Sequence, residues 1–214
     1  MPRRTVAIVP LRAPGAGKTR LATVLDPDQR ALLTAAMLGD VALALVRSNV
    51  DEIVVAAGGS SAAAAAAAIG LPVVTDTPGR ADLNRVLADA TRTVGAGHDV
   101  LIVAADLPRL TPEDVDAVLA IDGEVVVAPT NAGGTGGLLR RPGGRISTRF
   151  GPSSAIRHRE LALAAGCRVG TVERDGFRHD IDTWTDLVAL HEVEVGTATA
   201  AVLPSVLGRA VRAG

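Results

Sequence analysis

The chain has 214 residues, a length that suits one α/β domain over residues 1–214 with a substantial buried core. Its 22 Lys and Arg against 23 Asp and Glu give a net charge of −1, and with two Phe, one Trp and no Tyr this composition argues against a nucleic-acid-binding protein. A single cysteine, Cys167, excludes an internal disulfide and a cysteine metal cluster, and the lack of an apolar leader or membrane-length apolar run predicts a soluble, cytoplasmic protein without a membrane partner.

An apolar run at residues 6–9 predicts the first strand, and the loop after it ends in Gly17-Lys18-Thr19. This ending is typical of a phosphate-binding P-loop, but the spacing GxxxxGK[ST] requires a glycine where this chain has Arg12. Three interpretations stay open: a degenerate P-loop, a basic nucleotidyltransferase loop, and a solvated surface turn. We favour the second, in which Arg12, Lys18 and Arg20 neutralise a triphosphate.

Strand and helix patterns alternate over the following residues. Apolar residues at helical spacing, or a run of alanines, predict helices at residues 29–47, 62–68, 83–94 and from the capping sequence Thr111-Pro112-Glu113-Asp114 onward. Short apolar runs predict strands at residues 52–56, 73–74, 99–105 and 124–128. This alternation implies a mostly parallel central sheet with helices on both faces, a Rossmann-like α/β fold whose ligands bind beyond the carboxyl ends of the strands.

The second half of the chain is less regular. The glycines of residues 131–137 (NAGGTGG) predict either a plain hairpin loop or backbone N–H groups that approach an anion. In RFGPSSAIRHR, Gly151, Ser153 and Ser154 enter a helix predicted over residues 153–165, which favours an anion site at the helix start over ordinary N-capping. A strand at residues 168–173, a segment at residues 177–182 and a helix capped by Thr183 complete the fold.

Three carboxylates are candidates for a metal site. Asp106 follows the strand at residues 99–105, and Asp180 and Asp182 project from the same side of an extended segment because they are two residues apart. Carboxylates that meet need a cation between them, and hard oxygen ligands suit Mg²⁺. Each also has an ordinary alternative, since an Asp after a strand is often a turn residue and Asp182 could cap the next helix.

Six motifs, taken together, resemble a known family. In chain order to about residue 190 they are AIVPLRAPGAGKTRLATVL, ADLNRVL, VLIVAADLPRLTPED, GGTGGLL, RFGPSSAIRHR and HDIDTWTDL. This order resembles the phosphoenolpyruvate or 2-phospho-L-lactate guanylyltransferases of coenzyme F-420 biosynthesis. The resemblance implies a GT-A-like nucleotidyltransferase fold and transfer of GMP from GTP to the phosphate of a small phosphorylated carboxylic acid, with release of pyrophosphate.

The resemblance also implies roles for individual residues. Nucleotide-binding roles fall on Leu11, Arg12, Lys18, Arg20 and Asn84. The acceptor phosphate would be cradled by Thr135, Gly151 and Ser154. Mg²⁺ would be bound by Asp106, Asp180 and Asp182, and the catalytic set would be Lys18, Asp106 and Asp182. One departure is Arg12, because relatives often carry a Lys in the first part of this loop.

Other functions are also compatible with these residues. They are a nucleotidyltransferase of the sugar-phosphate or molybdopterin type, a P-loop-like kinase, and a nucleotide-binding regulator without turnover. Within the guanylyltransferase interpretation the sequence leaves phosphoenolpyruvate, 2-phospho-L-lactate and 3-phosphoglycerate open as acceptors, because each carries a phosphate and a carboxylate. A homodimer is compatible with the sequence, which does not specify the oligomeric state.

Overall fold

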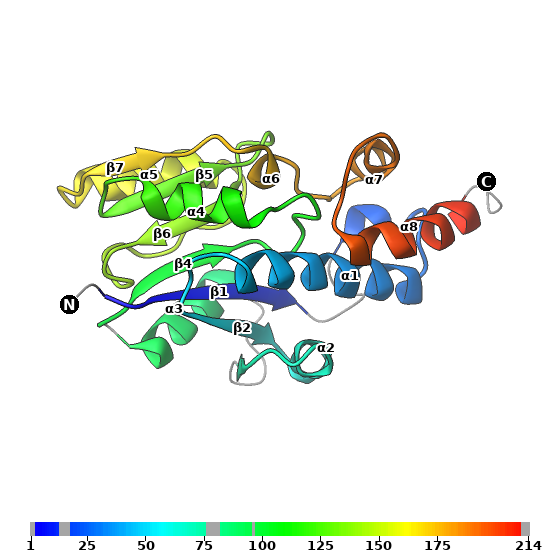
Figure 1. Ribbon diagram of the computed structural model, residues 1–214, viewed down its shortest axis with the longest axis horizontal. Helices are drawn as coiled ribbons and strands as arrows, with labels where there is room; N and C mark the ends of the chain where they lie inside the picture. The colour runs from blue at the N-terminus through cyan, green and yellow to red at the C-terminus, as the bar shows by residue number, and fades with distance from the viewer. Residues whose placement is uncertain (1–2, 13–17, 76–81, 96, 211–214) are drawn as a thin grey trace.

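A seven-stranded sheet forms the centre of the computed structural model, which describes the chain except residues 1–2, 13–17, 76–81, 96 and 211–214 (Figure 1). In spatial order the strands are β3 (Val73–Thr75), β2 (Glu52–Gly58), β1 (Thr5–Arg12), β4 (Asp99–Val103), β6 (Thr135–Arg140), β5 (Val125–Pro129) and β7 (Val169–Thr171). Among these described strands, β6 runs antiparallel to β4 and β5, and the remaining pairs are parallel. The predicted mostly parallel sheet is therefore confirmed.

Strand β6 differs from the sequence prediction. The glycines of residues 131–137 predicted either a hairpin loop or backbone N–H groups that approach an anion, and β5 and β6 do form an antiparallel hairpin. The chain nevertheless re-enters the sheet at Thr135, and all six residues of β6 are buried. Because both faces of this strand are covered, its sequence shows no alternation of polar and apolar residues, which is the usual mark of a strand.

Helices α4 and α7 begin where their capping residues, Thr111 and Thr183, predict. In chain order they are α1 (Pro27–Val46), α2 (Ser60–Ala68), α3 (Leu83–Val94), α4 (Pro112–Ala120), α5 (Ser154–Ala164), α6 (Asp175–Arg178), α7 (Trp184–Ala189) and α8 (Thr197–Ala210), with 3-10 turns η1 (Thr19–Leu21) and η2 (Leu190–Glu192). Thr111 and Thr183 each form a capping box with an Asp three residues later, so their side chains hold the starts of α4 and α7. The alanine-rich helix α2 is packed as predicted, with Ala62 and Ala66 buried.

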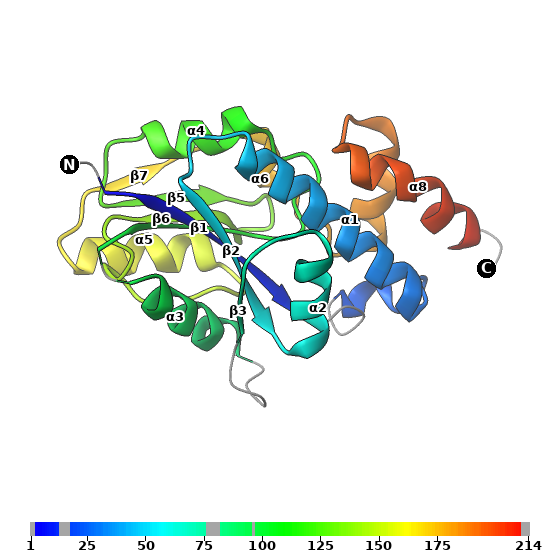
Figure 2. The same ribbon diagram turned by 60° about the horizontal axis from the view of Figure 1, so that its bottom comes forward.

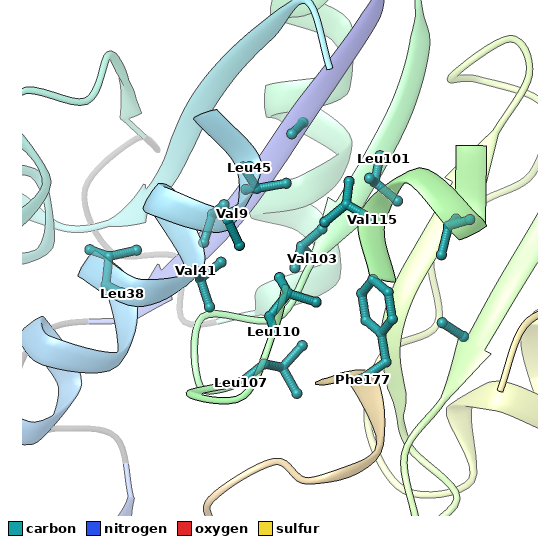
Figure 3. Close-up of a cluster of buried hydrophobic side chains, with 14 of the residues drawn as sticks. Val9, Leu38, Val41, Leu45, Leu101, Val103, Leu107, Leu110, Val115 and Phe177 are labelled. Atoms are coloured by element: carbon teal, nitrogen blue, oxygen red, sulfur yellow. The ribbon is translucent and has the colours of Figure 1, made fainter. Parts of the chain in front are cut away.

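The two faces of the sheet carry separate apolar clusters. Helices α1 and α4 cover one face and α3 and α5 cover the other (Figure 2). On the first face Val41 of α1 and Val115 of α4 lie over Val9 and Val103 of the central strands, and Phe177 of α6 closes the cluster (Figure 3).

A third apolar cluster lies beyond the end of β1, where α8 packs on α1. Helix α8 was not predicted from the sequence. Its start is fixed by the carboxylate of Asp40 in α1, which accepts hydrogen bonds from the backbone N–H groups of Ala198 and Thr199. By length and composition α1 could cross a membrane, but 56% of its apolar window is buried inside the protein, as in a core helix.

We predict that Gly136→Ala destabilises the fold, because a Cβ at this position would lie 2.5 Å from the carbonyl oxygen of Phe177. The backbone of β6 or of α6 must then shift, at a cost of about 1–3 kcal/mol in the free energy of unfolding. Urea denaturation measures this change.

Gly144→Ala is the matched control, because a Cβ there meets no described atom within 4 Å. Its free energy of unfolding should stay within about 0.5 kcal/mol of the wild type. Equal stability of the two variants would contradict the packing argument.

Candidate active site

The predicted site residues gather at one edge of the sheet. The parallel strands β1 and β4 end at this edge, followed by Lys18 and Asp106. Because β6 is antiparallel to β4, it begins at the same edge, which places Thr135 there. The end of β4 is joined to β6 by a backbone hydrogen bond from Ala104 N–H to the Gly136 carbonyl, at 2.9 Å. Residues that are far apart in the sequence therefore meet beyond the carboxyl ends of the strands, as predicted.

Lys18 lies between the carboxylates that were predicted to form a metal site. Its ammonium donates a hydrogen bond to Asp106, and Nζ is 3.5 Å from Oδ1 of Asp182. Only 8% of the Lys18 side chain is exposed. Burial alone would lower its pKa, but the charge and hydrogen bond of Asp106, with Asp182 and Asp180, outweigh burial and raise the pKa above its usual value. Lys18 is therefore charged and held in place.

Asp180 shows that negative charge exceeds positive charge in this cluster. Burial raises the pKa of its carboxyl, and the charges of Asp106 and Asp182 raise it further, whereas Lys18 lowers it. A single ammonium does not balance three carboxylates, so a further cation would be bound favourably.

The segment that carries Asp180 and Asp182 is anchored between them. Ile181 is buried in the third apolar cluster, and its N–H donates to the carbonyl oxygen of Asp106 at 3.3 Å. Since neighbouring side chains of an extended segment point to opposite sides, burying Ile181 turns both carboxylates toward Lys18. The alternative that Asp182 caps α7 is wrong, because the cap is Thr183, which accepts from the N–H of Asp186.

The donor chemistry of this cluster fits a hard divalent cation, because three carboxylates lie close enough for Asp106 and Asp182 to repel the charge of Asp180. In the described part of the chain, however, no group of three or more His, Cys, Asp or Glu side chains has the arrangement of a preformed metal site. The Lys18 ammonium is the cation found among the carboxylates here. A metal would therefore need these side chains to rearrange.

The basic loop after β1 is described only at its two ends. Arg12 ends β1 and Arg20 lies in η1, and both are exposed. The side chain of Leu11 is buried in the core, so its backbone alone could meet a nucleotide. Residues 13–17, which carry the glycines of the P-loop comparison, lie outside the described residues. Lys18 adopts a left-handed backbone conformation with φ 56°, and its side chain lies against Asp106 and Asp182.

Thr135, Gly151 and Ser154 come together as predicted for an anion cradle. The hydroxyl oxygens of Thr135 and Ser154 are 2.9 Å apart, and the Ser154 N–H donates to the Gly151 carbonyl at 3.1 Å. Gly151 has φ 129°, a conformation that favours glycine. The alternative of ordinary N-capping is wrong for α5, because the Ser153 side chain makes no capping hydrogen bond to any described residue.

Asn84 connects the first turn of α3 to the loop before α5. Its amide donates to the Phe150 carbonyl at 3.2 Å and accepts from the Phe150 N–H at 2.7 Å. This pair of hydrogen bonds holds the loop that leads into Gly151 and Ser154. The amide keeps one N–H and one lone pair for the predicted contact with a nucleoside.

His158 is a buried member of the site that sequence reasoning did not single out. Its Nε2 accepts from the Arg149 N–H at 2.8 Å, and its Nδ1 lies 3.0 Å from the Thr135 hydroxyl. Burial lowers the pKa of its imidazole from 6.5 to about 4. Positive charges that add to this effect come from Arg140, Arg157 and Arg149. The available signal was its position four residues after Ser154, on the same face of α5.

A cavity of about 510 Å³ lies elsewhere, between α1, α4, α6 and the start of α8. Its described lining includes Asp40, Arg109 and Arg174 but none of the predicted site residues. Arg109 is paired with Asp175 and Arg174 with Asp114, so the guanidinium groups already have anionic partners. We therefore take the cluster of Lys18, Asp106, Asp180 and Asp182 at the sheet edge, and not this cavity, as the candidate active site.

The sequence and the fold both resemble those of known nucleotidyltransferases. Residues 5–206 match the family model described as "Guanylyl transferase CofC like". The chain is 34% identical to a phosphoenolpyruvate guanylyltransferase of Nocardia farcinica, covering 94% of this chain and 92% of the relative. It is 35% identical to a 2-phospho-L-lactate guanylyltransferase of Methanothermobacter thermautotrophicus, covering 88% and 85%. A solved structure from Desulfovibrio desulfuricans G20, assigned as a nucleotide-diphospho-sugar transferase, superposes with a TM-score of 0.76 at 17% identity, covering 97% of both chains.

We predict that the free energy of unfolding falls between pH 6.5 and about pH 4 because of His158. The unfolded chain binds a proton near pH 6.5, whereas the folded chain does so only near pH 4, so acid favours unfolding throughout this window. The expected contribution is about 2 kcal/mol at pH 4.5. Urea denaturation at pH 7.5 and pH 4.5 measures it.

His158→Gln removes the titrating group and should lose this part of the pH dependence. His191→Gln, at an exposed position, is the control and should keep it. An unchanged pH dependence in His158→Gln would show that His158 is not buried as a neutral ring.

Proposed function

The chain belongs to the guanylyl transferase CofC-like family, and we propose that it transfers GMP from GTP to the phosphate of phosphoenolpyruvate or 2-phospho-L-lactate and releases pyrophosphate. The observation that carries this proposal is the match over residues 5–206, which includes all of the motifs that meet at the sheet edge. The reaction would serve coenzyme F-420 biosynthesis in the cytoplasm. Bacterial relatives named for phosphoenolpyruvate favour that acceptor.

The reaction proposed is a direct displacement at phosphorus. An oxygen of the acceptor phosphate attacks the α-phosphorus of GTP, and the bond between this phosphorus and the oxygen that bridges to the β-phosphate breaks. The electron pair of that bond leaves with pyrophosphate. Since the attacking oxygen is already anionic, no side chain has to remove a proton from it. This agrees with a site whose one buried histidine, His158, is neutral and hydrogen-bonded on both sides.

Basic side chains after β1 would hold the triphosphate. Lys18 is fixed at the edge of the site by Asp106, and Arg12 and Arg20 are exposed on the two sides of the loop. Positive charge at these positions offsets the charge that develops on the leaving pyrophosphate. Lys18 is proposed as a catalytic residue because its ammonium would lie nearest the reacting phosphates.

Asp106, Asp180 and Asp182 would hold Mg²⁺. The support for this proposal is that three carboxylates face one ammonium: the pKa of Asp180 is raised by burial and further by the charges of Asp106 and Asp182. When bound, Mg²⁺ supplies positive charge to the attacking and leaving oxygens. The protein's own part would be to hold these carboxylates near Lys18, and the support for this is the buried Ile181 between Asp180 and Asp182 and the contacts of the Lys18 ammonium with Asp106 and Asp182.

The acceptor phosphate would lie against Thr135, Gly151 and Ser154. Neutral hydroxyl and backbone groups orient a phosphate by hydrogen bonds without neutralising its charge, so the attacking oxygen stays nucleophilic. Asn84, bonded to Phe150, would place the nucleoside end of GTP beside this loop.

We predict that pyrophosphate release requires both GTP and a phosphorylated carboxylic acid in the presence of Mg²⁺. The measurement is a matrix of the four NTPs against phosphoenolpyruvate, 2-phospho-L-lactate, 3-phosphoglycerate and glucose 1-phosphate. Release with GTP and phosphoenolpyruvate or 2-phospho-L-lactate is the expected result.

Each alternative gives a different product in the same matrix. A P-loop-like kinase would leave a nucleoside diphosphate, and a nucleotide-binding regulator would bind GTP without any release. Pyrophosphate release with glucose 1-phosphate and with none of the phosphorylated acids would contradict the proposed acceptor and favour a sugar-phosphate nucleotidyltransferase.

We predict that Asp182→Asn lowers turnover on the order of 100-fold or more while the fold is kept. The substitution preserves size but removes one negative charge from the proposed metal set. Because Thr183 caps α7, the helix keeps its start and the melting temperature should hardly change. Steady-state rates across a Mg²⁺ titration, measured beside a thermal melt, give both quantities.

Asp122→Asn is the matched control, because Asp122 is an exposed carboxylate paired with Arg168 away from the site. It should keep the wild-type rate. Wild-type turnover in Asp182→Asn, or a fall in melting temperature that accounts for the lost activity, would refute the metal assignment.

A further inference from the structure

An exposed arginine lies against the loop of the proposed acceptor site. Arg157 is in α5, three residues after Ser154, and its guanidinium folds back to donate a hydrogen bond to the carbonyl oxygen of Pro152. A Cβ placed on Gly151 would lie 3.5 Å from Nη2 of Arg157, which is an ordinary contact distance. Arg157, Gly151 and Pro152 are all exposed. A molecule in solution can therefore reach the guanidinium and this loop together.

The guanidinium of Arg157 has donors that no side chain of the described residues uses. Its hydrogen bond goes to the Pro152 carbonyl, and no ion pair joins it to a carboxylate in the part of the chain that the structure describes. By contrast, Arg145, Arg168 and Arg174 each pair with a carboxylate. A guanidinium carries five N–H donors in one plane, so Arg157 keeps a pair of parallel donors of the kind that binds a carboxylate.

The charge of Arg157 acts on the interior of the acceptor half of the site. Together with Arg140 and Arg149 it adds to the effect of burial that lowers the pKa of His158, and Nδ1 of this histidine lies 3.0 Å from the Thr135 hydroxyl. Only 3% of Arg140 is exposed, whereas Arg149 and Arg157 are exposed. An anion that binds from solution at this loop therefore meets the positive charge of Arg157.

The proposed acceptors carry two anionic groups with different needs. The phosphate supplies the attacking oxygen, which loses nucleophilicity when a cation neutralises it, so neutral hydroxyl and backbone groups suit it. The carboxylate takes no part in bond formation, and a planar guanidinium matches its two oxygens. In phosphoenolpyruvate and 2-phospho-L-lactate the carboxylate is on the carbon that bears the phosphate ester oxygen. Its partner must therefore lie next to the residues that hold the phosphate, as Arg157 lies next to Gly151.

We propose that Arg157 is a specificity-determining residue that pairs with the carboxylate of the acceptor and so selects a phosphorylated carboxylic acid over a sugar phosphate. This role rests on the proposed function, which supplies the acceptor. The phosphate lies against Thr135, Gly151 and Ser154, and the carboxylate lies against the guanidinium of Arg157. A sugar phosphate has no group for this guanidinium to pair with.

A purely structural role for Arg157 is the competing explanation. Its hydrogen bond to the Pro152 carbonyl could serve only to hold the loop before α5. Loss of such a tether would weaken the binding of every acceptor that uses Gly151 and Ser154, with or without a carboxylate. A direct role is lost only when the carboxylate is present, so a matched pair of acceptors separates the two explanations.

The test is a cycle between the side chain of Arg157 and the carboxylate of the acceptor. The acid that the matrix selects is compared with an analogue that has a methyl group in place of the carboxylate, isopropenyl phosphate for phosphoenolpyruvate or isopropyl phosphate for 2-phospho-L-lactate. Arg157→Gln should lower kcat/KM for the acid about 10-fold, mainly by raising its KM. It should leave the KM of GTP and kcat/KM for the methyl analogue within about twofold. If the analogue turns over too slowly, its inhibition constant against the acid replaces kcat/KM.

Arg159→Gln is the matched control, because Arg159 is an exposed arginine of the same helix whose guanidinium donates to the Thr171 hydroxyl. It should keep kcat/KM within about twofold for both acceptors. Since Arg157 is exposed, Arg157→Gln should keep the melting temperature of the wild type. An equal fall in kcat/KM for the acid in both variants would show a general effect of positive charge and overturn the proposal.

The remaining outcomes separate this role from the proposed function. An equal fall for the acid and for the methyl analogue in Arg157→Gln would overturn the carboxylate pairing in favour of the tether. Normal wild-type turnover with a wild-type kcat/KM for the acid in Arg157→Gln would overturn only the role of Arg157. A wild-type protein that releases no pyrophosphate with any acceptor would overturn the proposed function and this role together.

Discussion

Close packing of Phe177 on the glycines of β6 is the contact on which the candidate site depends. A Cβ on Gly136 would lie 2.5 Å from the Phe177 carbonyl oxygen, and a Cβ on Gly137 would lie 2.8 Å from its ring. Without side chains at these two positions, α6 can lie directly on the strand. The segment after α6 then lies at the end of β4, where the Ile181 N–H donates to the Asp106 carbonyl. The packing of Phe177 on these glycines is therefore what brings Asp180 and Asp182 close to Asp106. The same strand begins with Thr135, so one element positions both the carboxylates and the proposed acceptor cradle.

Charge divides the site into two unlike halves. Around Lys18, burial alone would lower the pKa of the ammonium, and the neighbouring carboxylates raise it, so Lys18 depends on these neighbours to stay charged. Around His158, burial and nearby arginines keep the imidazole neutral, and the contacts are made by hydroxyl and backbone groups. A triphosphate needs compensating charge, whereas an attacking phosphate oxygen needs orientation and loses nucleophilicity when its charge is neutralised. The proposed reaction assigns each substrate to the half that suits it.

The sequence predicts the parts of this arrangement that depend on local patterns. The helix starts at Thr111 and Thr183 follow from capping chemistry, and the buried strand before Asp106 follows from an unbroken apolar run. The spacing of Asp180 and Asp182 predicts that they share one side of the chain, because alternation in an extended segment is a property of the backbone. The family resemblance then names the remaining site residues, which the structure brings together at Thr135, Gly151 and Ser154.

What local patterns could not predict depends on contacts between distant segments. Strand β6 looks like a loop in the sequence, because its glycines serve the packing of Phe177 rather than a turn. The ammonium of Lys18 among the carboxylates requires the fold to bring residues 88 positions apart within hydrogen-bond reach. His158 is the clearest example, because the tautomer of a histidine on a helix is not defined until its hydrogen-bond partners are known. Here the partner that sets the tautomer is the backbone N–H of Arg149. Every residue except proline has such a group, so a sequence motif cannot identify it. The protonation state and the direction of the hydrogen bonds are thus properties of the tertiary structure, although each atom involved is encoded locally.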